Sequence, residues 1–215
     1  MCAKIKNVLI VGGSGKIGSA IALGMKSMGY KVFIVARNEQ KLSETQKKIG
    51  DGCQSLVFDV TWTDKKITEF FTNFIKVYGG IDILVYAAGS HGSLPFDTCT
   101  SESFDDSFSV DLKGCYFVCQ SYVNSNFNST GQVIIISSIS SFKPALTAGQ
   151  MAKWALRGFL GGLAEYCAKK NINVFGIAPG HLTKENNIEE RILNTVKKMC
   201  DSPEIFDVGE IAIID

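Results

Sequence analysis

Residues 8–18 read Val-Leu-Ile-Val-Gly-Gly-Ser-Gly-Lys-Ile-Gly, a run of strand-forming residues that enters a glycine-rich turn. After the turn, apolar and small residues recur at helical spacing, at Ile17, Ala20, Ile21 and Gly24. This order of strand, glycine turn and helix is the setting of a dinucleotide site, where backbone N–H groups approach a pyrophosphate at a helix N-terminus. The pattern Gly-x-Gly-x-x-Gly over 13–18 also fits an ordinary turn, so the rest of the chain has to decide.

The composition excludes several classes of protein. The chain has 215 residues and a net charge of +1. This fits one globular domain over residues 1–215 and argues against nucleic acid or an acidic membrane surface as a partner. No stretch is long and apolar enough to span a bilayer, and too few residues precede the first strand for a signal peptide. We therefore expect a cytoplasmic protein that does not bind a membrane.

The seven cysteines include no Cys-x-x-Cys pair. An odd number of cysteines without metal-ligand spacing indicates reduced cytosolic thiols, and we expect no metal site. Cys115 and Cys119 lie four residues apart in a predicted helix. We interpret them as small buried residues rather than metal ligands.

Seven apolar runs of strand length recur along the chain, and most are continuous, as in strands covered on both faces. They span 8–11, 31–36, 55–60, 82–87, 132–137, 172–178 and 210–214. Segments of helical period lie between them, at 39–49, 63–78, 101–126, 150–169 and 188–200. This alternation predicts an α/β fold of Rossmann type. We expect a doubly wound, three-layer α/β/α structure around a mostly parallel seven-stranded sheet.

The residue after the second predicted strand bears on the kind of dinucleotide. A site for NAD commonly places an acidic residue there for the ribose hydroxyls, whereas this chain has Arg37. A guanidinium pairs well with a 2′-phosphate, and Lys16 in the glycine turn adds a second positive charge. We therefore expect NADP(H) to be preferred over NAD(H). The alternative is that Arg37 is a solvated loop residue.

Short motifs along nearly the whole chain are similar to those of one family. In order, they are Gly12–Gly18, Asp59-Val60, Ala87-Ala88-Gly89, Val110-Asp111-Leu112-Lys113-Gly114, Ile136-Ser137-Ser138, Lys153 and Ala178-Pro179-Gly180. Through these motifs the chain resembles the short-chain dehydrogenases/reductases. The resemblance implies an oxidoreductase that moves a hydride between a nicotinamide cofactor and the carbonyl or alcohol carbon of a small molecule.

The resemblance assigns cofactor roles to residues at the strand ends. Asp59 would hold the adenine amino group, and Val60 would contact the adenine through its backbone. Ala88 and Gly89 would line the adenosine ribose. The predicted cofactor-binding set is Gly12, Ser14, Gly15, Lys16, Ile17, Gly18, Arg37, Asp59, Val60, Ala88, Gly89, Lys153, Pro179 and Gly180.

The nicotinamide end is also assigned by resemblance, with one departure in the turn. Lys153 would hold the nicotinamide ribose, and the Pro179–Gly180 pair would pass beside the nicotinamide. The family usually has glycines in the pattern Gly-x-x-x-Gly-x-Gly. This chain has Gly12 and Gly18 at the ends of that pattern but Lys16 in the middle. Phosphate binding remains expected, because the turn keeps other glycines and gains a cation.

The predicted catalytic residues depart further from the family. In the family reaction a tyrosine protonates the substrate oxygen, a lysine four residues later supports the tyrosine, and a serine hydrogen-bonds the same oxygen. By resemblance Ser138 is the serine and Lys153 the lysine. Gly149 stands at the tyrosine position and Asp111 at that of an asparagine. We expect Asp111 to be able to pair with Lys153 and keep that lysine charged.

A missing general acid typically lowers the rate by about 10²–10⁴. His181 follows the Pro179–Gly180 pair and is the first candidate for a replacement acid. His91 has a similar claim, and Thr147 is near in sequence but its hydroxyl is a poor acid. The alternative, a loop histidine facing solvent, is the favoured interpretation of His181. The predicted catalytic set is Ser138, Lys153, Asp111 and His181.

Three functional hypotheses remain open. The first is an NADP(H)-dependent oxidoreductase with a degenerate active site, and the second is a catalytically silent NADP(H)-binding or cofactor-sensing protein. A weaker third is a dinucleotide-type fold that binds no cofactor. By resemblance, the helices over 101–126 and 150–169 form the interface of a homo-oligomer, a dimer or tetramer, although their large side chains equally suit the protein's own core.

Overall fold

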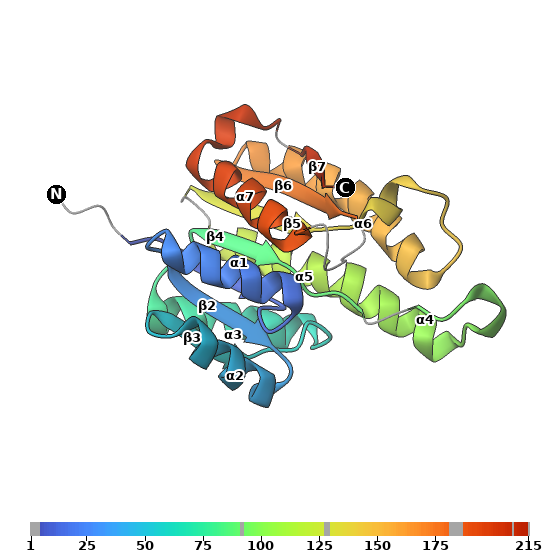
Figure 1. The fold of residues 1–215 in the computed structure, drawn as a ribbon, viewed down its shortest axis with the longest axis horizontal. Coiled ribbons are helices and arrows are strands. Elements are labelled where there is room, and N and C mark those ends of the chain that lie inside the picture. The colour runs from blue at the N-terminus through green and yellow to red at the C-terminus, as the bar shows by residue number, and fades with distance from the viewer. Residues whose placement is uncertain (1–4, 91–92, 127–129, 181–186, 208, 215) are drawn as a thin grey trace.

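The computed structural model describes residues 5–90, 93–126, 130–180, 187–207 and 209–214. These residues form one parallel sheet of seven strands, ordered β3-β2-β1-β4-β5-β6-β7 (Figure 1). The strands are β1 (Asn7–Val11), β2 (Lys31–Ala36), β3 (Cys53–Val57), β4 (Ile83–Tyr86), β5 (Gly131–Ile136), β6 (Ile172–Pro179) and β7 (Ile211–Ile214). The predicted α/β class and seven-stranded sheet are confirmed.

Helices cover both faces of the sheet (Figure 1). The α-helices are α1 (Lys16–Ser27), α2 (Glu39–Ile49), α3 (Asp64–Tyr78), α4 (Ser101–Phe108), α5 (Cys115–Ser125), α6 (Ala148–Ala168) and α7 (Ile188–Asp201). Shorter helical segments are η1 (Phe96–Thr98), η2 (Ser109–Gly114), η3 (Ile139–Phe142) and η4 (Pro203–Ile205). The first, second and seventh α-helices pack on one face, and the third, fifth and sixth on the other. The predicted three-layer arrangement is therefore confirmed.

The first strand explains why the apolar runs are continuous. Val8 and Ile10 belong to the hydrophobic cluster under α1, α2 and α7, whereas Leu9 and Val11 belong to the cluster under α3, α5 and α6. All four side chains are at most 1% exposed. Because successive side chains of a strand point to opposite faces, a strand buried on both faces needs an apolar residue at every position.

Capping side chains explain where three of the helices begin. The Asn38 side chain accepts the Lys41 N–H at the start of α2, and Thr63 caps α3 in the same way. Thr147 and Gln150 form a reciprocal capping box at the start of α6. Helix α6 consequently begins two residues before the predicted start at 150, and Gly149 lies in its first turn.

The predicted strand over 55–60 is wrong at both ends, since β3 spans Cys53–Val57. Val57 pairs with Ala36, the last residue of β2, and the Phe58 N–H still donates to the Ala36 carbonyl. No further β2 residue is left to pair, so the chain turns away from the sheet. Asp59 therefore lies just beyond the carboxyl end of β3, as a ligand-facing position requires.

The single long helix predicted over 101–126 is also wrong. A π-helical turn, η2, separates α4 from α5. The buried Tyr86 hydroxyl donates to the Val110 carbonyl at 2.6 Å, which competes with the regular helical ladder. A Cβ on Gly114 would lie 2.8 Å from the Cβ of Val60, so the end of this turn packs closely on the segment after β3. Such π turns are frequent at functional sites.

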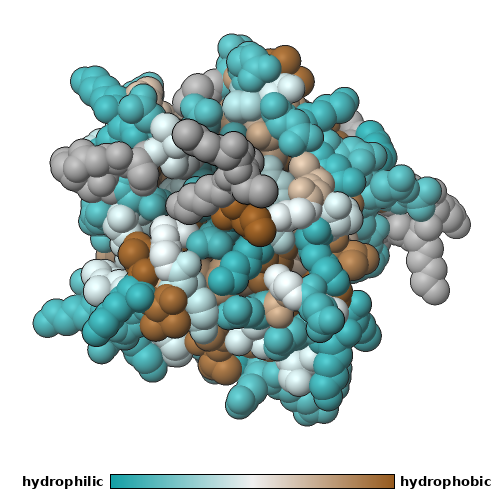
Figure 2. Space-filling model, turned by 90° about the vertical axis from the view of Figure 1, so that its left-hand side faces the viewer, coloured by the Kyte–Doolittle hydropathy of each residue, from teal (hydrophilic) through white to brown (hydrophobic). Residues whose placement is uncertain are grey.

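The side of the molecule at the left of Figure 1 is largely hydrophilic, and Figure 2 shows its hydrophobic side chains in small separate groups. Scattered groups of this size are ordinary on a solvated surface. Within the described residues, no helix has the length and apolar character needed to cross a bilayer.

Candidate active site

The glycine turn lies between β1 and β4, where the strand order changes direction, at the carboxyl ends of the strands. Gly12 has a φ of +82°, and a Cβ there would lie 2.6 Å from the backbone nitrogen of Ala88. A Cβ on Gly18 would overlap the Gly12 carbonyl oxygen. Both positions therefore need glycine, and the turn and the end of β4 form one close-packed surface.

Helix α1 begins directly in this turn. Gly15 is its N-cap residue, and no side chain caps the helix. The N–H groups of Lys16, Ile17 and Gly18 lie in the first turn, where an α-helix has no acceptor for them. These N–H groups and the helix dipole favour an anion such as a phosphate, and the exposed or half-buried Ser14 and Gly15 leave the approach open.

Lys16, predicted as an extra phosphate ligand, has a protein partner. Its ammonium lies 2.6 Å from the Glu189 carboxylate, in the first turn of α7. The hydrogen bond from Lys16 is the main reason that the pKa of Glu189 is lowered, and the backbone N–H of Glu189 adds to it. The lysine side chain is 57% exposed, so it is accessible to a ligand as well.

The glycine turn rests on the end of β2. The N–H groups of Gly12 and Gly13 both donate to the Val35 carbonyl, at 2.8 and 3.2 Å. Arg37 follows two residues after Val35, just beyond β2. Its side chain is exposed and has no ion-pair partner among the described residues. Arg37 thus follows directly after the strand end that supports the glycine turn, and its side chain is open to a ligand.

The end of β3 lies next to that of β2 and carries two more of the predicted site residues, Asp59 and Val60. One Asp59 carboxylate oxygen accepts two hydrogen bonds from Thr61, from its N–H at 2.9 Å and its hydroxyl at 2.8 Å. These bonds fix the carboxylate and involve only one of its two oxygens. Val60 is half-buried, and its carbonyl oxygen packs on Gly114 of the π turn. Gly12, Arg37 and Asp59 therefore belong to three adjacent strand ends, β1, β2 and β3.

A buried ion pair occupies the other end of the site. The Lys153 ammonium lies 2.8 Å from a carboxylate oxygen of Asp111, which is the pairing that the sequence predicted. Their side chains are 14% and 2% exposed. The second Asp111 oxygen accepts the Ser90 hydroxyl at 2.5 Å, and the Ser90 N–H lies 3.4 Å from both oxygens. The buried carboxylate is thus fully partnered, as burial of a charge requires.

This ion pair lies next to the cofactor-facing end of β4. A Cβ on Gly89 would lie 3.3 Å from Asp111 and 3.9 Å from the Lys153 ammonium. Gly89 follows Ala88, which contacts the glycine turn. The described contacts therefore run without a break from the glycine turn to Lys153. Ser90 had no predicted role, although its place directly after the Ala87–Gly89 motif was a usable signal.

Ser138 lies just beyond β5, where it caps η3 and accepts the Ser140 N–H at 3.2 Å. It is half-buried, whereas the neighbouring Ser137 is buried and its hydroxyl has no hydrogen-bond partner among the described residues. The Ser138 hydroxyl remains able to donate, because it only accepts in its hydrogen bond with the Ser140 N–H. Ser138 therefore retains the hydrogen-bonding capacity that its predicted role needs.

The space that a side chain at Gly149 would need is occupied by a residue from another segment, Ser93. Its N–H donates to the Ser93 hydroxyl at 2.7 Å, and a Cβ at 149 would overlap that hydroxyl. Ser93 comes from the segment after β4 and lies 3.4 Å from the hydroxyl of the buried Ser107. The segment after β4 therefore docks on the first turn of α6, and no side chain at 149 fits while Ser93 keeps this place. No sequence signal marked Ser93.

The remaining predicted residues divide into two groups. Pro179 ends β6, and the Gly180 N–H donates to the Ile214 carbonyl at 2.7 Å, so both lie at the carboxyl edge of the sheet. His181 and His91 lie outside the described residues. Across the part of the chain that the structure describes, no group of three or more His, Cys, Asp or Glu side chains could hold a metal ion.

Cys115 and Cys119 are fully buried, as the sequence predicted. Their sulfur atoms lie 4.0 Å apart as free thiols. The six cysteines in the described ranges are all free.

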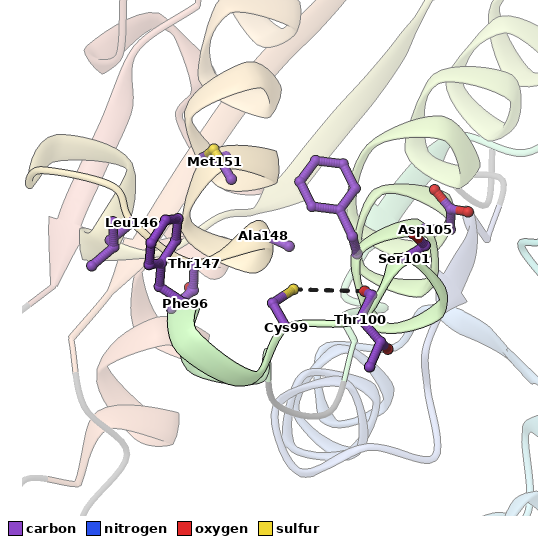
Figure 3. A pocket seen from close by; sticks show the side chains of 10 residues that line it. Phe96, Cys99, Thr100, Ser101, Asp105, Leu146, Thr147, Ala148 and Met151 are labelled. Atoms are coloured by element: carbon purple, nitrogen blue, oxygen red, sulfur yellow. Dashed lines mark hydrogen bonds between the residues drawn. The ribbon is translucent and has the colours of Figure 1, made fainter.

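A cavity of about 430 Å³ opens beside Gly149 (Figure 3). Side chains of η1, α4 and the start of α6 face it, and Ala148 and Met151 lie on either side of Gly149 in the chain. Its lining residues are Phe96, Cys99, Thr100, Ser101, Phe104, Asp105, Leu146, Thr147, Ala148 and Met151. A mostly apolar cavity of this size with a few polar groups is typical of a small-molecule site. The sequence did not predict it, since it joins segments about 40 residues apart in the chain.

Comparison with known proteins agrees with this geometry. The sequence profile of the short chain dehydrogenase family matches residues 6–192. An uncharacterized oxidoreductase of Staphylococcus saprophyticus is 32% identical over 182 residues, which cover 81% of this chain and 77% of that protein.

Solved structures show the same fold at low sequence identity. A short chain dehydrogenase from Bacillus anthracis superposes with a TM-score of 0.89 at 21% identity, covering 98% of this chain and 95% of its own. Actinorhodin polyketide ketoreductase, solved with NADPH, gives a TM-score of 0.87 at 18% identity and the same coverage of both chains. At these identities the likeness establishes the fold.

Proposed function

The chain belongs to the short-chain dehydrogenase family, and from that premise we propose that it is an NADP(H)-dependent oxidoreductase with an altered active site. The substrate is a small molecule with a carbonyl or alcohol group. One observation carries the choice of cofactor: the exposed Arg37, which has no ion-pair partner among the described residues and follows the strand end on which the glycine turn rests. A ketoreductase of the same fold is described with NADPH.

The proposed binding mode uses the adjacent strand ends. The first-turn N–H groups of α1 bind the pyrophosphate, and Arg37 pairs with the 2′-phosphate. Asp59 and the backbone of Val60 contact the adenine, Ala88 and Gly89 line the adenosine ribose, and Lys153 holds the nicotinamide ribose. The bound cofactor supplies or accepts the hydride. Every other step depends on the residues at the Lys153 end of the site.

The altered part of the active site is the proton donor. Gly149 stands four residues before Lys153, at the position of the family's tyrosine. Ser138 hydrogen-bonds the substrate oxygen, and the Asp111–Lys153 pair supplies the charged groups nearest to it. His181, which lies outside the described residues, remains a proposed source of the proton that the family's tyrosine would supply. The cavity beside Gly149 is the proposed substrate site.

A second candidate function is a silent NADP(H)-binding or cofactor-sensing protein. The contact between Ser93 and Gly149 favours it, because the segment after β4 fills the place where a side chain at 149 would begin. The variant Ser93→Ala/Gly149→Tyr separates the two functions. If it oxidises NADPH with a carbonyl that leaves the wild type inactive, the natural protein is a silent binder.

We propose one domain over residues 1–215, assembled as a homo-oligomer in the cytoplasm. A shallow groove of about 510 Å³ on the face of α4, η2, α5 and α6 supports the assembly. Tyr116 and Trp154 are 44% and 43% exposed on α5 and α6, and both large rings are suited to burial by a second copy. The free cysteines agree with a reducing compartment.

The test is a titration with NADPH and NADH, followed by a screen of aldehydes and ketones for NADPH oxidation. We expect NADPH to bind at least about tenfold more tightly than NADH, since hydrogen bonds to a charged group contribute about 1.5–3 kcal/mol. Arg37→Asp reverses that preference. Lys41→Asp, on the outward side of the following helix, is the matched control and leaves it unchanged. Binding of neither cofactor would overturn both candidate functions.

A further inference from the structure

We propose that Lys153 itself protonates the substrate oxygen, with Asp111 and Ser90 as positioning residues that hold its ammonium in place. The proposal rests on the oxidoreductase function proposed above and names the proton donor of that reaction. It starts from the buried chain of contacts Ser90–Asp111–Lys153 and from the absence of space for a side chain at 149.

The ammonium is fixed and still reachable. One carboxylate oxygen of Asp111 holds it at 2.8 Å, and the other oxygen is held by the Ser90 hydroxyl at 2.5 Å. An ammonium has three N–H donors, so two remain after the pair with Asp111 is formed. The Lys153 side chain is 14% exposed and its ammonium lies next to Gly89, so it is not fully enclosed by the protein.

The other described acids near the site are committed elsewhere. The Tyr86 hydroxyl is buried and donates to the Val110 carbonyl, and burial raises its pKa. Asp59 lies on the adenosine side and is bound by Thr61. Thr147 caps α6. Among the residues that the structure describes at this end, Lys153 is a cation that keeps N–H groups available to a ligand.

The chemistry balances without a further reagent. When bound, the reduced cofactor would supply a hydride to the carbonyl carbon, and the carbonyl π electrons would go to the oxygen. A Lys153 N–H proton then moves to that oxygen, giving the alcohol and a neutral amine, and water returns a proton to the amine. A lysine ammonium and a tyrosine phenol are acids of similar strength in water, so the substitution is chemically reasonable.

The test separates the positive charge of Lys153 from its ability to give up a proton. Lys153→Arg keeps a cation for Asp111 and for the ribose, but a guanidinium does not release a proton in proteins. We expect NADPH affinity within about threefold of wild type and kcat lowered by at least about 100-fold, the usual contribution of a general acid. Lys169→Arg, at the other end of α6, is the control and keeps full activity. Lys153→Ala provides a second route, since added methylammonium can take the vacated place beside Asp111 and restore turnover.

The positioning role of Ser90 has its own readout. Ser90→Ala lowers kcat without changing NADPH affinity, and Ser90→Thr, which keeps the hydroxyl, restores it. Lys153→Arg that retains kcat within about threefold, or Lys153→Ala that no amine rescues, overturns the proposal while leaving the oxidoreductase function intact. A wild type that binds NADPH but reduces no carbonyl overturns the oxidoreductase function and this proposal with it.

Discussion

The two ends of the site are built on different physical principles. At the glycine turn, the ligand-facing groups are backbone N–H groups and an exposed guanidinium, held by close backbone packing around Gly12. At Lys153, the groups are a buried ammonium and carboxylate that satisfy each other. The first end is open to a charged ligand, whereas at the second end the charges of Lys153 and Asp111 already cancel each other. If the proposed function is correct, substitutions at the two ends should therefore affect cofactor binding and turnover separately.

The largest effect is expected from breaking the buried pair. Lys153→Met leaves the Asp111 carboxylate, 2% exposed, without its counter-charge, and we expect a loss of about 3–5 kcal/mol in the free energy of unfolding. Asp111→Asn/Lys153→Met removes both charges and should recover most of that loss. Urea unfolding of the two variants measures the difference. Equal stability of the two would show that the pair does not act as a unit.

The next effect is expected in the glycine turn. Gly12→Ala forces a left-handed backbone on alanine and places its Cβ against Ala88, so we expect a loss of about 1–3 kcal/mol and weaker NADPH binding. Gly15→Ala is the matched control. Its Cβ meets only the Gly12 carbonyl, at 3.2 Å, and its φ is −79°. If both variants lose NADPH binding to the same degree, close packing at Gly12 is not what shapes the site.

A smaller effect is expected where Ser93 docks on α6. Gly149→Ala displaces the Ser93 hydroxyl and removes the acceptor of its own N–H, which we expect to lower stability by about 1–2 kcal/mol. Ser93→Ala removes the overlapping hydroxyl in advance. The double variant should therefore lose less than the sum of the two single variants, as in a coupled pair. Additive losses in thermal unfolding would mean that the two positions do not touch in solution.

The smallest effect is expected from the surface pair of Lys16 and Glu189. Glu189→Gln changes stability by less than about 1 kcal/mol, because exposed ion pairs contribute little. It also frees Lys16 for the pyrophosphate, so NADPH should bind a few-fold more tightly at low salt. The lowered pKa of Glu189 means that the pair contributes stability above the ordinary carboxyl range and loses it as pH falls through that lowered pKa. NADPH affinity that is unchanged in Glu189→Gln would show that Lys16 does not reach the phosphates.

The strands and several helix starts were predictable because their causes are local. An apolar residue at every position of β1 follows from burial on both faces, and Asn38 or Thr63 marks a helix start by its own side chain. The π turn was not predictable, since it depends on a hydrogen bond between Tyr86 and Val110, 24 residues apart.

The site shows the same division. The pairing of Asp111 with Lys153 could be predicted because a known motif set their positions and their charges are opposite. Ser93 could not, because nothing in its neighbours reveals that it ends on Gly149, 56 residues later. Contacts that no motif fixes, such as the cavity wall from η1 to α6, become visible only in the folded chain.

The most direct test of the account is isothermal titration of the wild-type protein with NADPH and with NADH, followed by the same titration of Lys153→Arg. The account predicts that NADPH binds at least about tenfold more tightly than NADH and that the Lys153→Arg variant keeps this preference. The kcat of that variant, measured as NADPH oxidation with a carbonyl substrate, should fall. A wild type that binds NADH as tightly as NADPH, or neither of them, would contradict it.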